Sequence, residues 1–114
     1  MSEGKIEVNL KKVGDLWTAT IDGQDYGFRK WTWGEKNDLS SKCTRVNFMT
    51  GASEFDNKYF NEQMFLATVR KKADGKFTNF TLEELRTSDS QLIDMLFKIS
   101  QELNLVKLFE TRNL

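Results

Sequence analysis

The chain has 114 residues, 39% of them hydrophobic and 30% charged, which predicts one globular domain that folds around a single core, alone or as a small homo-oligomer. Seventeen basic residues balance seventeen acidic ones, so no net charge draws the protein toward nucleic acid or an anionic membrane. With no histidine and a single cysteine, the chain excludes a conventional zinc site, a histidine-based triad and an intramolecular disulfide.

The first thirty residues carry the pattern of an antiparallel sheet. Polar and apolar residues alternate over 5–10 and again over 16–21, as in strands with one buried face. Asp22-Gly23 predicts a tight turn, because both positions tolerate a positive φ, and residues 24–30 resume the extended pattern. We therefore expect a three-stranded meander over residues 5–30, which needs a second layer to cover its apolar face.

The first helix is marked by Thr32 and Glu35, which have the spacing of a capping box. In such a box the threonine accepts the backbone N–H three residues on, while the glutamate accepts the N–H of the cap itself. The apolar stripe of this helix is narrow and consists of Leu39, Cys43 and Val46. Residues 48–55 then break both periodicities, which predicts a loop or a small hairpin.

A second helix follows the capping residue Asp56. Its apolar residues, which continue to Val69, surround most of the helix circumference, so we expect it to be the central helix of the core. Arg70-Lys71-Lys72 would occupy its last turn, where the helix dipole favours cations, and Asp74-Gly75 would end it.

Two further helices complete the pattern. Thr81 and Glu84 form a second capping box at the start of a short helix, and Ser88 and Gln91 repeat that spacing before a final amphipathic helix that ends at Asn104.

These elements predict the α+β fold class for a single domain over residues 1–114. An N-terminal three-stranded antiparallel meander packs against about four C-terminal helices, which occupy residues 33–104. Residues 105–114 form a tail with several apolar residues and no further cap, so this tail either docks on the domain or is held out for a partner.

Trp31 and Trp33 stand on either side of the first capping residue. Tryptophan brings a large rigid surface and a hydrogen-bond donor, so it is enriched at interfaces, although it serves equally well as a core anchor. Together with the end of the third strand and the apolar tail, these tryptophans define a set of candidate partner-binding residues. The set consists of Phe28, Trp31, Trp33, Leu105, Leu108 and Phe109.

No motif predicts catalysis, a metal site or a bound cofactor. Capping already explains the paired carboxylates Glu83-Glu84, and Cys43 lies on an apolar stripe without a histidine to activate it. The segment from Tyr26 to Trp31 interleaves aromatic and basic residues, as platforms for single-stranded nucleic acid do. Zero net charge and the ordinary use of aromatics to cover a small sheet favour a structural role for that segment.

Three short segments share a pattern with one protein family. The first is Trp31-Thr32-Trp33-Gly34-Glu35-Lys36-Asn37-Asp38, with Cys43-Thr44-Arg45-Val46 following it. The second is Phe55-Asp56-Asn57-Lys58-Tyr59, which runs into the apolar helix through Leu66. The third is Thr81-Leu82-Glu83-Glu84-Leu85-Arg86, followed by a helix that ends in Leu103-Asn104. Together, residues from about 28 to 104 resemble the tail assembly chaperones of long-tailed bacteriophages and related prophages.

That resemblance implies a non-enzymatic protein of the prokaryotic host cytoplasm. It would bind the tape-measure protein and help tail-tube subunits assemble, without remaining in the mature virion. The sequence agrees with this location, since it holds no apolar run that predicts a secretion signal or a membrane span. Two alternatives are a protein-interaction module that uses Trp31 and Trp33 for another partner, and a single-strand nucleic-acid binder that uses the strand from Tyr26 to Trp31.

Overall fold

The computed structural model of the protein describes residues 10–105. In chain order, its strands and helices are β1 (Lys11–Val13), β2 (Leu16–Ile21), β3 (Gln24–Phe28), α1 (Trp33–Cys43), β4 (Thr44–Val46), β5 (Ser53–Phe55), α2 (Asn57–Thr68), β6 (Val69–Ala73), β7 (Lys76–Asn79), α3 (Leu82–Thr87) and α4 (Ser90–Leu103).

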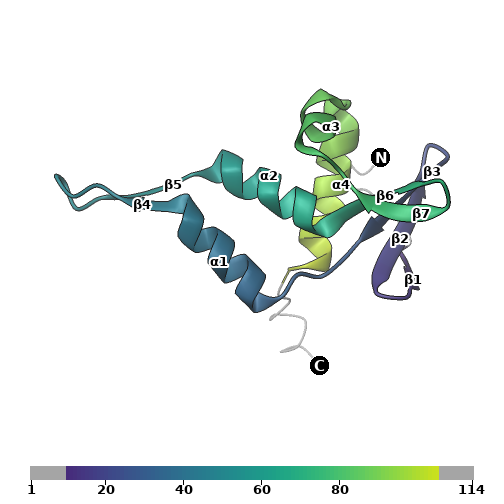
Figure 1. The fold of residues 1–114 in the computed structure, drawn as a ribbon, viewed down its shortest axis with the longest axis horizontal. Helices are drawn as coiled ribbons and strands as arrows, with labels where there is room; N and C mark the ends of the chain where they lie inside the picture. Colours follow the sequence, from purple (N-terminus) through teal and green to yellow (C-terminus); the bar gives the residue numbers. More distant parts are fainter. Residues whose placement is uncertain (1–9, 106–114) are drawn as a thin grey trace, which may run out of the picture.

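Five strands form one antiparallel sheet in the order β1-β2-β3-β6-β7, with helices packed against one face (Figure 1). The α+β fold class and the N-terminal meander are therefore confirmed. Asp22 and Gly23 join β2 to β3, and both have a positive φ, as the predicted tight turn requires. Residues 5–9 of the predicted first strand lie outside the described residues. Its last residue, Leu10, is not in a strand, and the first strand that the structure describes, β1, lies just after the predicted one.

Residues 69–79 form a β-hairpin, which corrects the prediction that Arg70-Lys71-Lys72 end a helix. Helix α2 ends at Thr68, and the first three residues of β6, 69–71, pair with residues 26–28 of β3. There are two physical reasons. Without β6, the backbone N–H and C=O groups along one edge of β3 would be unpaired. The β-branched Val69 also favours a strand, and it is fully buried there. Asp74-Gly75 is accordingly the turn of this hairpin, with φ values of 52° and 77°.

Most of the predicted helix caps are confirmed: Thr32 with Glu35, Asp56, and Thr81 with Glu84. Helix α4 differs, because the side chain of Asp89 accepts the N–H of Leu92 and the predicted box that begins at Ser88 is wrong. Ser88 instead follows the last residue of α3, and its hydroxyl donates to the backbone carbonyl of Glu84. The predicted helical part, residues 33–104, thus holds four helices and also strands β4 to β7.

The core lies between the sheet and helices α2 and α4. Its fully buried side chains include Phe28 from β3, Val69 from β6, Phe65 from α2 and Leu96 from α4. These four come from segments far apart in the sequence, so the core forms only when the meander, β6 and both helices have come together.

The chain between α1 and α2 forms a hairpin that extends away from the sheet (Figure 1). We call residues 44–55 the arm. The N–H of Asp56 donates to the carbonyl of Cys43 at 2.8 Å, so the two ends of the arm lie side by side. The prediction of a loop or small hairpin here is confirmed as a hairpin. Because α1 ends at Cys43, Val46 belongs to β4 and not to the helical stripe.

The arm gives the molecule an extended outline. The radius of gyration is 16.3 Å, whereas a compact chain of this length has a radius of gyration of about 13 Å. The longest axis of the molecule runs from the arm to the sheet, with helices α2 and α4 between them (Figure 1).

Candidate protein-docking surfaces

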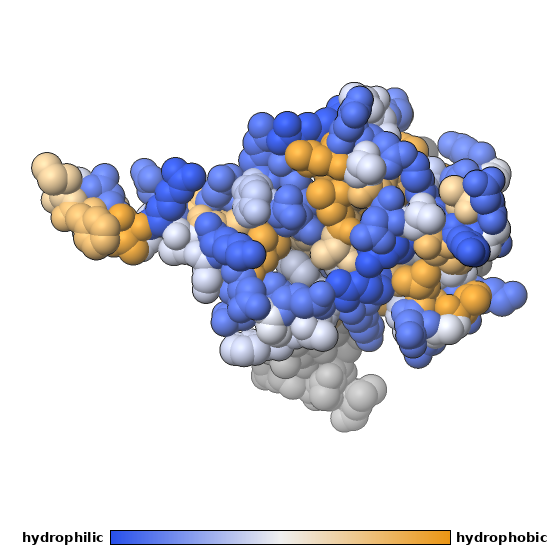
Figure 2. All heavy atoms as spheres, in the orientation of Figure 1, coloured by the Kyte–Doolittle hydropathy of each residue, from blue (hydrophilic) through white to orange (hydrophobic). Residues whose placement is uncertain are grey.

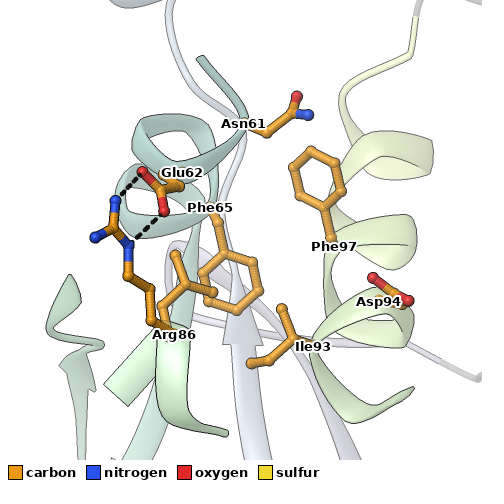
Figure 3. A pocket seen from close by; sticks show the side chains of 8 residues that line it. Asn61, Glu62, Phe65, Arg86, Ile93, Asp94 and Phe97 are labelled. Carbon is orange, nitrogen blue, oxygen red and sulfur yellow. Dashed lines mark hydrogen bonds and ion pairs between the residues drawn. The ribbon is translucent and has the colours of Figure 1, made fainter. Parts of the chain in front are cut away.

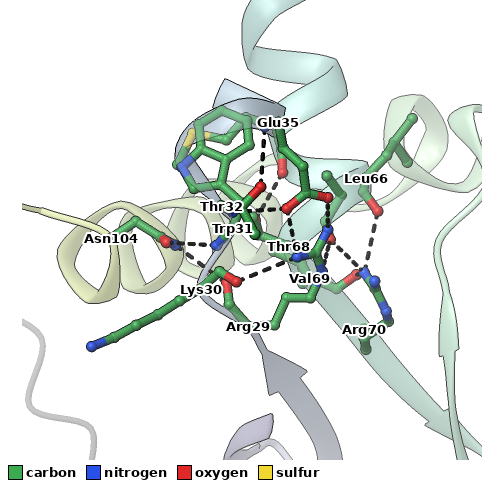
Figure 4. Close-up of polar contacts among 12 residues, drawn as sticks. Arg29, Lys30, Trp31, Thr32, Glu35, Leu66, Thr68, Val69, Arg70 and Asn104 are labelled. Atoms are coloured by element: carbon green, nitrogen blue, oxygen red, sulfur yellow. Dashed lines mark hydrogen bonds and ion pairs between the residues drawn. The ribbon is translucent and has the colours of Figure 1, made fainter. Parts of the chain in front are cut away.

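Trp31 connects the end of β3 to the end of α4. Its backbone N–H donates to the side-chain oxygen of Asn104 at 3.1 Å, and the side-chain nitrogen of Asn104 donates to the carbonyl of Arg29 at 3.3 Å (Figure 4). The half-buried Trp31 ring meets the ring of Phe60 edge to face, with 5.9 Å between the ring centroids. The segment that leads into α1 is therefore fixed on two sides.

The first turn of α1 is held by an ion pair as well as by its capping box. The guanidinium of Arg29 binds both carboxylate oxygens of Glu35, at 2.7 and 3.0 Å, and its Nε donates to the carbonyl of Ala67 at 2.8 Å (Figure 4). The same carboxylate accepts the N–H of Thr32 at 2.8 Å. The hydrogen bonds from Arg29, and then that from the Thr32 backbone, lower the pKa of Glu35 from 4.5 to about 2.

Two of the candidate partner-binding residues are strongly exposed on this rigid frame. Trp33, at the first position of α1, is 78% exposed, and Leu105, which follows Asn104, is 63% exposed. Because Trp31 lies beside Asn104, the structure gathers three candidates from both halves of the chain in one region. We call Trp31, Trp33 and Leu105 the tryptophan corner.

The other three candidates do not join this corner. Phe28 is fully buried in the core, so in this fold it has no surface to offer a partner, contrary to its place among the candidates. Phe28 lies two residues after Tyr26 and therefore on the same face of β3, which α2 and α4 cover, and Val69 of β6 lies next to it. Leu108 and Phe109 lie outside the described residues.

The proposed nucleic-acid platform is also mostly buried. Tyr26 and Phe28 both point into the core and cannot stack on bases. The Arg29 side chain is engaged by Glu35, and Lys30 lies over the ring of Trp17 at 5.9 Å from its centroid. The strand from Tyr26 to Trp31 thus presents no row of exposed aromatic rings.

The arm carries the most exposed large apolar side chains of the described residues. Phe48 is 96% exposed and Met49 is 93% exposed, and they form an apolar tip that projects into solvent (Figure 2). The tip is an ordered turn held by Asn47. The side-chain oxygen of Asn47 accepts the N–H of Met49 at 2.9 Å, and the backbone carbonyl of Asn47 accepts the N–H of Gly51 at 2.7 Å. Sequence reasoning missed this surface. Its only signal was a pair of adjacent apolar residues inside a predicted turn.

A pocket of about 310 Å³ opens between α2, α3 and α4 (Figure 3). Phe65 forms its buried floor, and half-buried Leu85, Ile93 and Phe97 form its walls. The rim is polar and consists of Asn61, Glu62, Arg86 and Asp94.

One ion pair fixes part of that rim. Arg86 donates to both carboxylate oxygens of Glu62, at 2.7 and 3.0 Å, which lowers the pKa of Glu62 and ties α3 to α2 (Figure 3). Sequence reasoning missed the pocket because its lining comes from three helices whose packing no local pattern specifies.

The described residues offer little to metal or thiol chemistry. Among residues 10–105, no group of three or more His, Cys, Asp or Glu side chains is placed to hold a metal ion. Cys43 is buried, and burial raises the pKa of its thiol, which disfavours the reactive thiolate.

Within the same part of the chain, the helices are all too short or too polar to cross a bilayer. No family model, curated protein or solved structure gives a significant match to this chain.

Proposed function

We propose that this protein is a non-enzymatic tail assembly chaperone of a bacteriophage or prophage, which binds the tape-measure protein or a tail-tube subunit through the tryptophan corner. The observation that carries this proposal is the exposure of Trp33 on a frame held by Glu35 and Asn104. The resemblance of the three sequence segments, the first of which contains Trp33, supplies the identity of the partner.

Rigidity makes this exposed indole suited to binding. An exposed tryptophan brings a large contact area and a hydrogen-bond donor at a small cost in side-chain entropy. Its backbone is already ordered by the capping box and the ion pair between Arg29 and Glu35, so a partner need not order it on binding. Leu105 adds apolar area to the same region.

Co-elution with a tail component tests the proposal directly. The protein is mixed with a tape-measure segment or a tail-tube subunit from the same genome, and complex formation is followed by size-exclusion chromatography. We expect a complex with the unaltered protein and at least a tenfold weaker one with Trp33→Ala, since central tryptophans contribute on the order of 2 kcal/mol or more at interfaces.

Phe48→Ala is the matched control, because Phe48 is an even more exposed aromatic residue on the arm, away from the corner. It should leave the complex intact. Binding of no tail component would sink the chaperone proposal. A different protein partner whose binding also depends on Trp33 would instead identify a general protein-interaction module.

A further inference from the structure

The arm tip and the pocket are complementary in chemistry, although they belong to different parts of the molecule. The tip offers two adjacent apolar side chains, Phe48 and Met49, that are almost completely exposed. The pocket offers an apolar floor and walls around a space of about 310 Å³. An apolar cavity of about 150 Å³ is large enough to hold benzene, so this space can accept a phenyl ring together with part of a second side chain.

The arm cannot fill the pocket of its own chain. It leaves the body at the start of α2 and extends away from the sheet, whereas the pocket lies back along the body, where α2 meets α3 and α4 (Figures 1 and 3). The hydrogen bonds made by Asn47 and the paired strands β4 and β5 keep the arm straight. Any arm that fills this pocket must come from another molecule.

Every copy of the chain carries both a tip and a pocket, and charge does not keep copies apart. The whole chain has a formal net charge of zero. The arm holds one basic and one acidic residue, Arg45 and Glu54, which lie opposite each other in the hairpin, so the arm has no net charge. On the pocket rim, Glu62 is paired with Arg86, and Asp94 adds one acidic side chain. No like-charge field therefore opposes contact between two copies.

We propose that the protein self-associates head to tail, with Phe48 and Met49 of one copy seated in the pocket between α2, α3 and α4 of the next. Such a contact is heterologous, so each added copy leaves one free tip and one free pocket, and the copies form a ring or an open chain. The contact uses no residue of the tryptophan corner, and its outcome is independent of whether a tail protein binds there.

Two variants separate the two halves of this contact. Phe48→Ser with Met49→Ser removes the tip while leaving the pocket, and both positions are too exposed to affect folding. Asn61→Trp covers the pocket from its exposed rim beside Phe97 while leaving the arm (Figure 3). If Asn61→Trp disturbs the fold, as judged by circular dichroism, Asp94→Trp covers the pocket from α4.

Sedimentation velocity of the purified full chain, without any tail protein, measures the mass of the species in solution. Protein concentrations from roughly 1 μM to 1 mM cover the dissociation constants expected for a small contact. We expect the unaltered protein to grow in mass with concentration and each variant alone to stay monomeric. An equimolar mixture of the two variants should form a dimer that grows no further, because one variant supplies only the tip and the other only the pocket.

Trp33→Ser is the matched control and should associate like the unaltered protein, because it removes an exposed aromatic residue outside the contact. The inference is overturned if the unaltered protein remains monomeric at every concentration. It is overturned equally if the pocket variant still associates while the tip variant does not, since that result would mean contact between two arms.

Discussion

Trp33 and Phe28 are aromatic residues five positions apart whose surroundings are opposite. Phe28 is fully buried where β3 and β6 meet the helices, while most of the Trp33 ring is in water. Truncating Phe28 leaves a cavity and removes apolar contacts, whereas truncating Trp33 removes a side chain that stays mostly in water in the folded state. The two side chains therefore contribute to different processes, Phe28 to folding and Trp33 to binding.

This contrast predicts very different stabilities for two alanine variants. Phe28→Ala should lower the free energy of unfolding by about 3–5 kcal/mol, and Trp33→Ala should change it by no more than about 0.5 kcal/mol. Urea denaturation followed by far-UV circular dichroism measures both. A large loss of stability for Trp33→Ala would mean that the indole is a structural anchor and would remove the basis of the tryptophan corner.

Glu35 predicts a specific dependence of stability on pH. Because Arg29 and the Thr32 N–H lower its pKa in the folded state to about 2, the carboxylate stabilises the fold fully at pH values above its unfolded pKa near 4.5. That contribution is lost as the pH falls from about 4.5 to about 2. Since both side chains of the ion pair are partly exposed, we expect about 1 kcal/mol or less.

The variant Glu35→Gln isolates this effect, because glutamine keeps an oxygen for the Thr32 N–H and loses the charge. It should be less stable than the unaltered protein at pH 7, and most of that difference should be gone near pH 2, as measured by urea denaturation at both values. A stability difference that stayed constant across this range would show that the charge of Glu35 is not responsible.

At the residue scale, local chemistry was predictable and tertiary burial was not. The capping partners Thr32 and Glu35 are three residues apart, so their hydrogen bonds follow from the spacing alone. The complete burial of Phe28 depends on α2, β6 and α4, which are about forty or more residues later in the chain, and alternation along β3 could not reveal which elements would cover it.

Helices α2 and α4 are joined by two buried hydroxyl groups. The Thr68 hydroxyl donates to the carbonyl of Met64 at 2.8 Å and lies 2.6 Å from the hydroxyl of Ser100. Both side chains are fully buried, so neither can turn to water if its partner is removed. This pair is a buried polar connection between the two helices.

A double-mutant cycle should reveal the coupling between these helices. Thr68→Val preserves the side-chain shape and leaves the Ser100 hydroxyl without its partner, so we expect a loss of about 1–3 kcal/mol in unfolding free energy. Adding Ser100→Ala should cost less than it does in the unaltered protein, because the orphaned hydroxyl is then gone. Strictly additive losses, measured by urea denaturation, would mean that the two hydroxyls do not interact.

At the element scale, the four helices and strands β2 and β3 were predicted, whereas β1 and the hairpin of β6 and β7 were not. Arg70-Lys71-Lys72 after an apolar helix matches the preference of helix C-termini for cations, and that local rule outweighed the β-branched Val69. The Asp74-Gly75 dipeptide is as strong a hairpin signal as Asp22-Gly23, which was interpreted correctly. Asp74-Gly75 can either end a helix or form the turn of a hairpin. The unpaired edge of β3, which is a tertiary property, decides in favour of the hairpin.

The arm appears in the fold as an addition to a body that is complete without it. Its two ends are in contact through Cys43 and Asp56, and the fully buried core side chains all lie outside it. Replacing Arg45–Glu54 by Asn-Gly joins Thr44 to Phe55, which already face each other, through a two-residue turn.

We expect this shortened chain to keep its stability to within about 1 kcal/mol, since loop length contributes weakly to folding free energy. Its radius of gyration in small-angle scattering should fall from near 16.3 Å toward the roughly 13 Å of a compact domain. Loss of cooperative unfolding, or an unchanged radius, would mean that the arm is part of the body. Local pattern indicated a hairpin at this place, but neither its direction nor its exposed tip is encoded by residues close in sequence.

The position of β6 between β3 and β7 also has a consequence for synthesis. Tyr26 of β3 pairs with Lys71 of β6, and these two residues are 45 positions apart in the sequence. A ribosome that has released the chain through α2 has produced β3 with one edge still unpaired, and such an edge can pair with another nascent chain. Premature termination before β6 would therefore yield an aggregation-prone fragment, and the rate of complete folding should be set by this late, long-range strand pairing.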